Sequence, residues 1–312
     1  MTPRLDQISL HSYERQGLKA ALLRLLAPHG GLAALAPGKR VLLKPNFVMP
    51  EKPEDPSCTH PDFYMAVAEL LLEEGRAVSI GESPAFGSCE KGLRMHGVYD
   101  ECRSRGIGIV EFSGSRKFEG VAGDSWYEEL SVAGELRDFD AVINLPKLKV
   151  HQQFVLTGAV KNLYGCVVGR RKFLRHNLCD NDPRRFARMI IANADAVAAT
   201  LHLGDGIVAM HIKGPRGGRP YPLGQILLAQ DPYAHDWLQA LLMDHQPHAL
   251  PLFQALDPAR LEAARAAAEA LFHERGLKPA TSLVPSFRTD ISFSPRAILR
   301  SAWRLLKFKL RR

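Results

Sequence analysis

The sequence predicts an α/β protein with a mostly parallel sheet, flanking helices and a helical C-terminal extension. Short apolar runs rich in Val, Ile and Leu alternate with segments of helical periodicity, which is the pattern of parallel βαβ units. Gly, Pro and Asn residues mark the boundaries between these segments. The chain of 312 residues, 46% of them apolar, can bury a sizeable core as one large domain or two smaller ones. A two-lobed arrangement is compatible with the same pattern.

Each expected element has a local signal. Leucines recur at helical spacing in residues 13–27, and a buried strand at 40–44 leads into a long loop of turn-forming residues. Thr59 is a candidate N-cap for the next helix, which ends at Gly75. The other expected elements, in chain order, are a strand at 77–80, a helix at 89–104, strands at 107–112, 126–132 (antiparallel) and 140–145, a helix from 182 to about 192, strands at 198–203 and 223–229, and a helix at 231–243.

We expect residues 1–250 to form the α/β core domain. Beyond this range the composition changes, because an Ala-rich helix starts at Asp257-Pro258 and an irregular stretch covers residues 276–293. Residues 251–312 are therefore predicted to form a helical extension with a basic amphipathic helix at its end.

The net charge of +8 is concentrated at the C-terminus. Residues 294–312 hold seven of the 41 Lys and Arg residues and no acid, which leaves 34 basic against 33 acidic residues elsewhere. A basic helical stripe beside an apolar surface with Trp303 is typical of helices that bind anionic membranes. A helix that packs its apolar face on the core explains the same pattern. Nucleic-acid binding is not expected, because no recognised nucleic-acid-binding module is present.

Cysteine usage and the lack of long apolar runs indicate a cytoplasmic protein, peripheral on the inner face of the membrane if the terminal helix binds lipid. The five cysteines are odd in number and form no CxxC pair, which argues against a Cys-ligated metal or an iron–sulfur cluster. No stretch is long and apolar enough for a spanning helix, and residues 1–17 lack the apolar region of a secretory signal.

Polar side chains follow several of the expected strands. In open α/β sheets ligands bind outside the carboxyl ends of the strands, so we expect these residues at one rim. Lysines dominate the set, which favours an anionic ligand such as a carboxylate or a phosphate. A lone lysine such as Lys44 is most simply solvated, whereas Lys147, Lys149 and His151 alternate on one face. The rim residues are Lys44, Asn46, Glu82, Ser83, Lys147, Lys149, His151 and Asp205.

The string TGAVKNLYG at residues 157–165 is a second candidate feature. Thr157-Gly158 can open a helix whose free backbone N–H groups would bind an anion, and Lys161 and Asn162 lie about one turn in. The spacing differs from that of a P-loop. A capped helix with a surface lysine is an equally good interpretation.

Histidines supply the candidate acid/base groups. His151 accompanies the lysines and is the first candidate, with His176 as the second, since imidazole titrates near neutral pH. His60 is a further candidate for ligand contact. No metal-ligand spacing such as HExxH is present, so no metal is assigned.

Several separate strings resemble one known family, in order along the chain. They are KPN at 44–46, TH at 59–60, GESP at 81–84, LPKLKVH at 145–151, TGAVKNLYG at 157–165, Lys172 with His176, DGI at 205–207, GPRGG at 214–218 and DPYAHD at 231–236. On these motifs the chain, over about residues 40–245, resembles the "domain of unknown function 362" family, whose biochemical role is not generally established. Many relatives carry a ferredoxin-like module with clustered cysteines, which this chain lacks, so no iron–sulfur cluster is carried over. His211 stands where the family pattern is often acidic.

A fainter similarity is to the nickel-pincer-dependent lactate racemase family. It lies in the order and residue type of a TH-type motif after an early strand and of a later Gly/Lys-rich segment followed by His. This similarity implies a two-lobed α/β protein with Lys and His around a nucleotide-like cofactor and a hydroxy acid.

The leading hypothesis is an enzyme of unassigned class that acts on a small anionic substrate or uses a nucleotide-like cofactor. Lysines would bind the anion, Asn46 and Thr157 would orient it, and His151 would be the general acid/base. One alternative is a non-catalytic, membrane-associated binding or scaffold protein, and another is a racemase-like enzyme with a nucleotide-derived metal cofactor. The candidate residues are His151, His176 and Lys149 for catalysis, and Lys44, Asn46, His60, Glu82, Ser83, Lys147, Thr157, Lys161, Asn162 and Asp205 for ligand binding. The reaction, the cofactor and the oligomeric state are left open.

Overall fold

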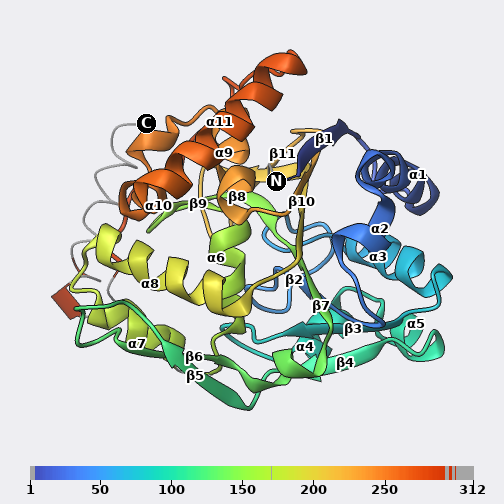
Figure 1. The fold of residues 1–312 in the computed structure, drawn as a ribbon, viewed down its shortest axis with the longest axis horizontal. Helices are drawn as coiled ribbons and strands as arrows, with labels where there is room; N and C mark the ends of the chain where they lie inside the picture. The colour runs from blue at the N-terminus through green and yellow to red at the C-terminus, as the bar shows by residue number, and fades with distance from the viewer. Residues whose placement is uncertain (1–3, 170, 292–294, 297–298, 300–312) are drawn as a thin grey trace.

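The computed structural model describes residues 4–169, 171–291, 295–296 and 299. It has the predicted α/β fold, in which a central sheet lies between two layers of helices (Figure 1). The strands are β1 Leu5–Ser9, β2 Arg40–Pro45, β3 Ala77–Glu82, β4 Gly108–Glu111, β5 Ser115–Glu119, β6 Glu129–Ala133, β7 Ala141–Leu145, β8 Lys147–His151, β9 Val155–Thr157, β10 Leu201–His211, β11 Arg219–Tyr221 and β12 Gln225–Ala229. The helices are α1 Arg15–Leu26, α2 Gly31–Leu35, α3 Pro61–Glu73, α4 Cys89–Met95, α5 Tyr99–Ser104, α6 Ala159–Leu163, α7 Arg171–Leu178, α8 Pro183–Val197, α9 Pro232–Leu242, α10 Pro251–Ala255 and α11 Pro258–Glu274.

The central sheet is mostly parallel, as predicted. Its strands lie in the order β1-β12-β10-β7-β2-β3-β4, and those from β10 to β4 run parallel to one another. β12 pairs antiparallel with β10, and β1 pairs antiparallel with β12 at the edge. All residues of β7 are buried, which explains its nearly uninterrupted apolar run.

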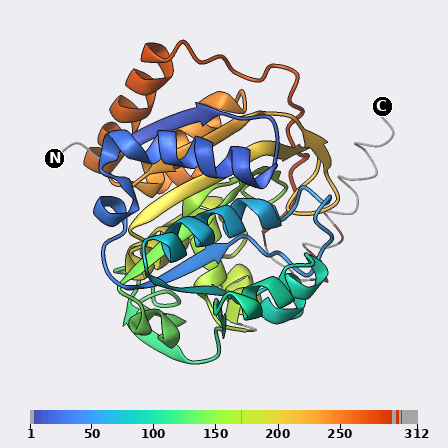
Figure 2. The same cartoon turned by 90° about the vertical axis from the view of Figure 1, so that its right-hand side faces the viewer.

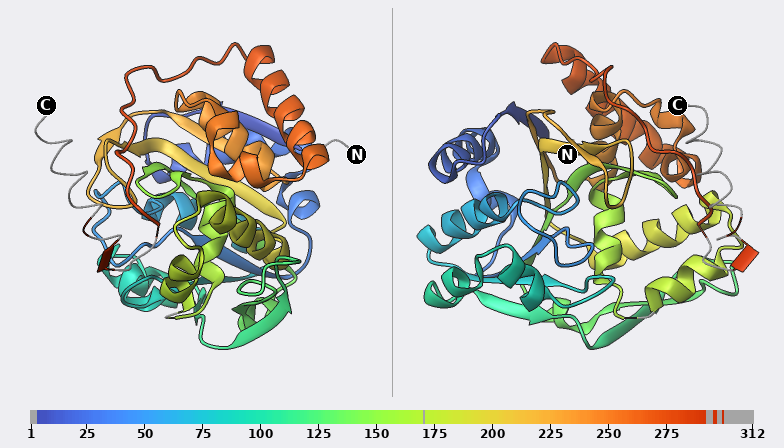
Figure 3. Two further views of the ribbon diagram at one scale, coloured as in Figure 1. Left: turned by 90° about the vertical axis from the view of Figure 1, so that its left-hand side faces the viewer. Right: turned by 180° about the vertical axis from the view of Figure 1, so that it is seen from behind.

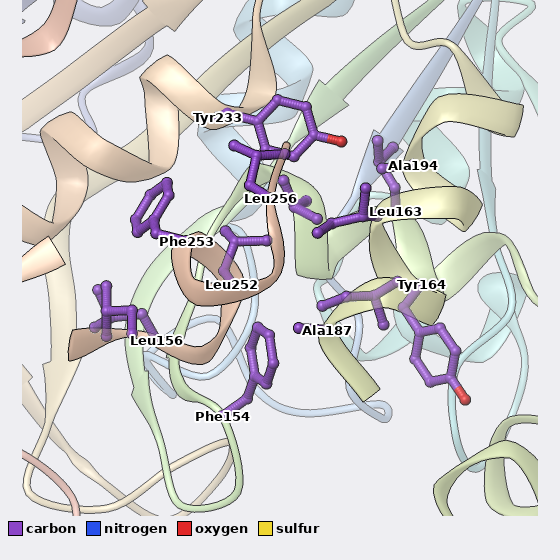
Figure 4. Close-up of a cluster of buried hydrophobic side chains, with 14 of the residues drawn as sticks. Phe154, Leu156, Leu163, Tyr164, Ala187, Ala194, Tyr233, Leu252, Phe253 and Leu256 are labelled. Atoms are coloured by element: carbon purple, nitrogen blue, oxygen red, sulfur yellow. The ribbon is translucent and has the colours of Figure 1, made fainter. Parts of the chain in front are cut away.

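Helices cover both faces of the sheet. α1 and α3 pack together on one face (Figure 2), where Leu18 of α1 is fully buried. The helices α6, α8 and α9 lie on the other face (Figure 3, left). On that side Leu163, Ala194, Tyr233 and Leu252 meet in the apolar core (Figure 4). The sheet is thus held between two apolar layers, which fix the positions of its strand ends.

Three Asp-Pro pairs start helices, as the sequence predicts. Asp182, Asp231 and Asp257 are the N-caps of α8, α9 and α11, and each carboxylate accepts a hydrogen bond from the backbone N–H two residues later. The proline occupies the first helical position, where its missing N–H group has no intrahelical partner to lose.

The strand that continues β7 carries the lysine-rich motif. β7 pairs with the start of β10, the chain turns at Pro146, and β8 pairs with the second half of β10. β8 then returns as β9 in a hairpin that places Lys149 opposite Thr157 and His151 opposite Val155. Directly opposed residues in such a pair lie side by side on one face, so Lys149 and Thr157 are neighbours.

The predicted N-cap of α3 is wrong. His60 caps the helix instead, because its Nδ1 accepts the backbone N–H of Asp62 at 3.2 Å. The hydroxyl of Thr59 donates to the carbonyl oxygen of Leu145 at 2.7 Å and so joins the start of α3 to β7.

Two predicted boundaries are also wrong. The helix expected over 89–104 is divided into α4 and α5, because the chain turns at Gly97 with a φ of 73°. The strand expected to end at 203 continues as β10 to His211, so Asp205 lies inside a strand and not after one. The sequence patterns predict neither the short edge strand β1 nor the largely polar helix α7.

The helices α10 and α11 and an irregular segment follow α9, and Leu252, Leu271 and Leu283 from this part of the chain belong to the apolar core. α11 packs against α9, and residues 276–291 run back across the molecule (Figure 3, left). The backbone N–H of Ile212 donates to the carbonyl oxygen of Val284 at 2.8 Å and anchors this segment to the end of β10. The basic helix predicted over 294–312 lies outside the described residues, apart from 295–296 and 299. None of the described helices is long and apolar enough to cross a membrane.

Candidate functional site

A cavity lies at the carboxyl ends of β2 and β3, where the β8–β9 hairpin, α6 and α7 enclose it. Its volume is about 190 Å³, whereas one buried water needs only about 10–15 Å³, so a small organic ligand fits. The predicted candidates that line it are Asn46, Glu82, Ser83, Lys149, His151, Thr157, Lys161, Asn162 and His176.

The wall of the cavity contains a buried ion pair. Lys44, which is 0% exposed, pairs with Glu82 and also donates to the carbonyl oxygen of Pro45 at 2.9 Å. Gly165 lies against this pair: a Cβ atom there would be 2.8 Å from Lys44 Cε and closer still to Glu82 Oε1. Lys44 is therefore not a solvated rim residue. It neutralises the carboxylate that lines the cavity.

A chain of amide side chains connects the ends of β2 and β7 through Asn162 of α6. Asn46 Nδ2 donates to Asn162 Oδ1 at 2.7 Å, and Asn162 Nδ2 donates to Asn144 Oδ1 at 2.7 Å. These bonds direct the remaining oxygen of Asn46 toward Lys149, whose Nζ donates to it at 2.8 Å. A second bond from Lys149 Nζ goes to the carbonyl oxygen of Ser57. The amides thus hold one lysine in place without neutralising it.

Three lysines that we call the cavity lysines, Lys149, Lys161 and Lys172, line the cavity. In the part of the chain that the structure describes, none of them forms an ion pair with a carboxylate. Lys149 and Lys172 donate to neutral oxygens, the latter to Ser83 O, and half-buried Lys161 has no hydrogen-bond partner among the described residues. Buried cations are normally paired, so this cluster, when protonated, carries positive charge that no ion pair with a described carboxylate offsets.

Burial makes these ammonium groups easier to deprotonate. It lowers the pKa of Lys149 to about 7, and the pKa values of Lys161 and Lys172 to about 8. Repulsion between neighbouring lysines adds to the effect, since Lys172 lowers the pKa of Lys161 further. All three amines therefore titrate within reach of neutral pH.

His151 lines the cavity, and the backbone of the following turn fixes its ring. Its Nδ1 accepts the backbone N–H groups of Gln153 at 3.1 Å and Phe154 at 3.2 Å. Burial, reinforced by Lys161 and Lys149, lowers the pKa of His151 well below its usual value, so the ring is neutral at pH 7. With Nδ1 occupied as an acceptor, the proton of the neutral ring is assigned to Nε2.

His176 lies on α7 between aromatic rings. Its ring is 5.7 Å from that of Tyr164 and 4.5 Å from that of Phe186. Burial lowers the pKa of His176 to about 3, with a further contribution from Lys161, so this ring is also neutral at pH 7.

Three predicted candidates lie outside the cavity lining, in a separate network. Lys147 Nζ donates to Asp205 Oδ2 at 2.8 Å, and the backbone N–H of His60 donates to the same oxygen at 3.0 Å. Tyr13 joins them: its hydroxyl donates to Asp205 Oδ1 at 2.6 Å, and its ring stacks on His60 at 3.8 Å. The charge of Lys147 is thus used inside the fold, which argues against its predicted role in holding an anion.

The prediction of free N–H groups at the start of α6 is wrong. Asp236 of α9 occupies that helix end, where its Oδ1 accepts the N–H of Ala159 at 2.5 Å and its Oδ2 that of Val160 at 3.1 Å. Gly158 allows this approach, because a Cβ atom there would lie 2.6 Å from Asp236 Cγ. Thr157, however, lines the cavity, and its buried hydroxyl has no hydrogen-bond partner among the described residues.

Lys172 lines the cavity, although it is not among the candidate ligand-binding residues predicted from the sequence. The signal for it is the four-residue interval to His176, which places both side chains on one face of a helix. His211, which departs from the family pattern, lies away from the cavity lining and accepts the backbone N–H of Val284 at 3.2 Å.

The described residues contain no group of three His, Cys, Asp or Glu side chains that could hold a metal ion. All five cysteines are buried and free.

The fold and the cavity define an α/β protein with a lysine-rich cavity at the carboxyl ends of its parallel strands. The chain belongs to the family described as "Domain of unknown function (DUF362)", whose sequence model matches residues 41–240. A thylakoid-associated protein of Synechocystis sp. is 36% identical to it over 309 residues, which cover 97% of this chain and 94% of that protein.

Two solved structures are similar at lower levels. The lactate racemase apoprotein from Thermoanaerobacterium thermosaccharolyticum has a TM-score of 0.42 and 13% identity, over 65% of this chain and 50% of the racemase. A protein from Thermotoga maritima has the same TM-score and identity, over 85% of this chain and 60% of that protein. The chain thus matches only half to three fifths of the length of these two proteins.

Proposed function

We propose that the cavity binds a small organic carboxylate or phosphate. The observation that carries this proposal is the set of cavity lysines without carboxylate partners, with Lys161 lacking any hydrogen-bond partner among the described residues. The Nε2–H group assigned to His151 and the unpartnered hydroxyl of Thr157 add neutral donors. Such a donor set suits an anion whose oxygens accept several hydrogen bonds.

The lowered pKa values support the proposal energetically. Burial raises the free energy of each protonated amine, and an anion at Coulombic contact would offset that cost. Binding would therefore raise the pKa values of the cavity lysines and take up protons from solution near pH 8.

If the site also catalyses a reaction, the roles differ from those that sequence patterns suggest. An amine that titrates near neutral pH can take and return a proton during turnover, so Lys161 or Lys149 would be the acid/base group. His151 would act as a neutral hydrogen-bond donor, because its pKa lies well below the working range.

The test is isothermal titration calorimetry at pH 7 with acetate and with inorganic phosphate. We expect wild-type protein to bind at least one of them, and Lys161→Met to weaken binding at least tenfold, since a charge-assisted hydrogen bond is worth about 1.5–3 kcal/mol. Lys91→Met is the matched control, because Lys91 is exposed on α4 away from the cavity. The proposal fails if the wild type binds neither anion, or if Lys161→Met binds as tightly as the wild type.

We propose, as a second candidate, peripheral association with an anionic membrane. The name of the Synechocystis relative refers to thylakoid association, and the basic segment 294–312 has the composition of a membrane-surface helix. Each basic residue near an anionic leaflet contributes about 1 kcal/mol.

Co-sedimentation with vesicles tests this candidate. We expect the full chain to sediment with an equal mixture of phosphatidylcholine and phosphatidylglycerol but not with phosphatidylcholine alone. A deletion of 294–312 should stay in the supernatant, while Lys91→Met should sediment like the wild type. Equal sedimentation of the deletion and the full chain would remove this segment from the proposal.

A further inference from the structure

The cavity changes in chemical character from its base to its mouth. Several of its cationic and hydrogen-bonding side chains are buried, since Lys149 is 0% exposed, His151 3% and Lys172 8%, whereas Lys161 is half-buried. Phe47 and Tyr164 of the lining are buried, but the rest of the apolar lining is more open, since Val48, Phe173 and Pro215 are half-buried and Ala85 is exposed. The charged end of the cavity therefore lies inside the protein, and the apolar end faces solvent.

The apolar residues lie around one opening because contacts join the loops that carry them. The backbone N–H of Ala85 donates to the carbonyl oxygen of Val48 at 3.1 Å. Phe86, next to Ala85, lies 5.7 Å from the ring of Phe173 on α7. On the other side, Arg216, next to Pro215, forms an ion pair with Glu51 of the loop that carries Val48.

The amide of Gln153, one polar group of the lining, is already engaged. Its Nε2 donates to the carbonyl oxygens of Asp290 at 3.0 Å and Ile291 at 3.1 Å. Phe86 is 61% exposed, which is unusual for an aromatic side chain and leaves apolar surface beside the mouth. A sugar or a nucleobase would find few free hydrogen-bonding partners here, whereas an alkyl chain or an aromatic ring would bury apolar surface.

We propose that the ligand is an amphipathic anion, with a carboxylate or phosphate group on the cavity lysines and an apolar body between Val48 and Phe173. This inference rests on the proposed function, because it assumes that the lysines bind an anion. It adds the chemical class of the rest of the ligand, because the charge of the cavity lysines defines only the anionic group. Inorganic anions and short polar acids would bind only through the base of the cavity.

Calorimetry with a graded set of probes tests the inference. Acetate, butyrate, hexanoate and benzoate share one carboxylate and differ in their apolar body, and phosphate with phenyl phosphate repeats the comparison for the other head group. We expect Kd to fall about fourfold for each methylene buried, as transfer from water predicts. Benzoate should bind at least tenfold more tightly than acetate, by the same relation.

Variants separate the two ends of the cavity. Phe173→Ser and Val48→Ser should each reduce the gain in affinity of hexanoate and benzoate over acetate, and leave the Kd of acetate unchanged. Lys161→Met should weaken every probe by the same factor. Trp126→Ser is the matched control, because Trp126 is an exposed aromatic side chain outside this cavity. Circular dichroism and Tm verify that each variant is folded.

Two outcomes overturn the inference and leave the proposed function intact. If acetate and hexanoate bind with the same Kd, an anion site exists but has no apolar subsite. If both mouth variants keep the full gain from hexanoate, the apolar body does not lie between Val48 and Phe173. Failure of every probe to bind would instead refute the proposed function, and this inference with it.

Discussion

Replacing Gly165 by alanine should disrupt the buried ion pair at the wall of the cavity. The new Cβ atom would lie 2.8 Å from Lys44 Cε and closer to Glu82 Oε1, whereas ordinary van der Waals contact begins at 3.4 Å. Lys44 must therefore retreat by about 0.9 Å, because its Nζ would lie only 2.5 Å from the new atom, and Glu82 must retreat by more. Neither can move into solvent, because their side chains are 0% and 2% exposed at the ends of β2 and β3.

The expected loss of stability depends on how the pair responds. Overpacking costs about 1–3 kcal/mol if the two side chains shift together, and about 3–5 kcal/mol is lost if they separate and leave a buried charge unpaired. Urea unfolding followed by circular dichroism measures the change. A loss of 1 kcal/mol lowers Tm by about 2–4 °C in domains of 150–250 residues, so the fall in Tm is also measurable.

Gly134→Ala is the control for this substitution. A Cβ atom there would have its nearest neighbour at 3.6 Å, an ordinary contact, so the change in stability should stay within about 1 kcal/mol. Gly165→Ala should also weaken anion binding, because Ser83 follows Glu82 and its carbonyl oxygen holds Lys172. If Gly165→Ala is as stable as the control variant, the crowded packing described for this site is incorrect.

Three further predictions address the cavity and its surroundings. The affinity for acetate should fall at least tenfold between pH 6.5 and 9, because the cavity lysines, with pKa values of about 7 to 8 in the free protein, lose their protons over this range. Binding at pH 8 should take up protons, which calorimetry in buffers of different ionisation enthalpy measures. An affinity that does not change with pH would contradict the assignment of these lysines to the anion site. Asp236→Ala should destabilise the protein by about 1–2 kcal/mol in urea unfolding, because it removes the cap of α6. Asp236→Asn should lose less stability. Equal stability of Asp236→Ala and the wild type would argue against the cap. Tyr13→Phe should lower the free energy of unfolding by about 1–3 kcal/mol, because it leaves the buried partners of the hydroxyl unsatisfied. The Kd for acetate should stay at the wild-type value, and a tenfold weaker Kd would place this network in the binding site.

Much of the site follows from one rule about parallel sheets. Asn46 and Glu82 come from separate segments of the chain but stand where β2 and β3 end, and Lys149 lies in β8 just beyond the end of β7; such ends gather at one edge. The cavity brings these three together, as the strand assignments imply. The family similarity adds Lys172 and His176, which strand ends do not predict because they lie on a helix.

The remaining features depend on partners that sequence patterns do not identify. Lys147 and Lys149 stand in the same motif, yet Asp205 neutralises only Lys147, because β10 continues past its expected end and carries Asp205 alongside β8. Asp236 reaches the start of α6 from a helix 77 residues later in the chain. Pairings of this kind are set by how the layers pack, whereas spacing along the chain reports only local structure.

The pairing of β1 with β12 also delays the completion of folding during biosynthesis. Leu5 lies opposite Ala229 in the register of these strands, so β1 cannot pair until β12 has been made. At about 5–20 residues per second, translation of the intervening chain takes about 11–45 s. During that time β2, β3 and β4 are all available to associate, while the edge of the sheet beside β10 stays open. An emerging chain that stops before residue 225 would expose that edge, which makes the newly synthesised protein a candidate for chaperone protection until translation has passed β12.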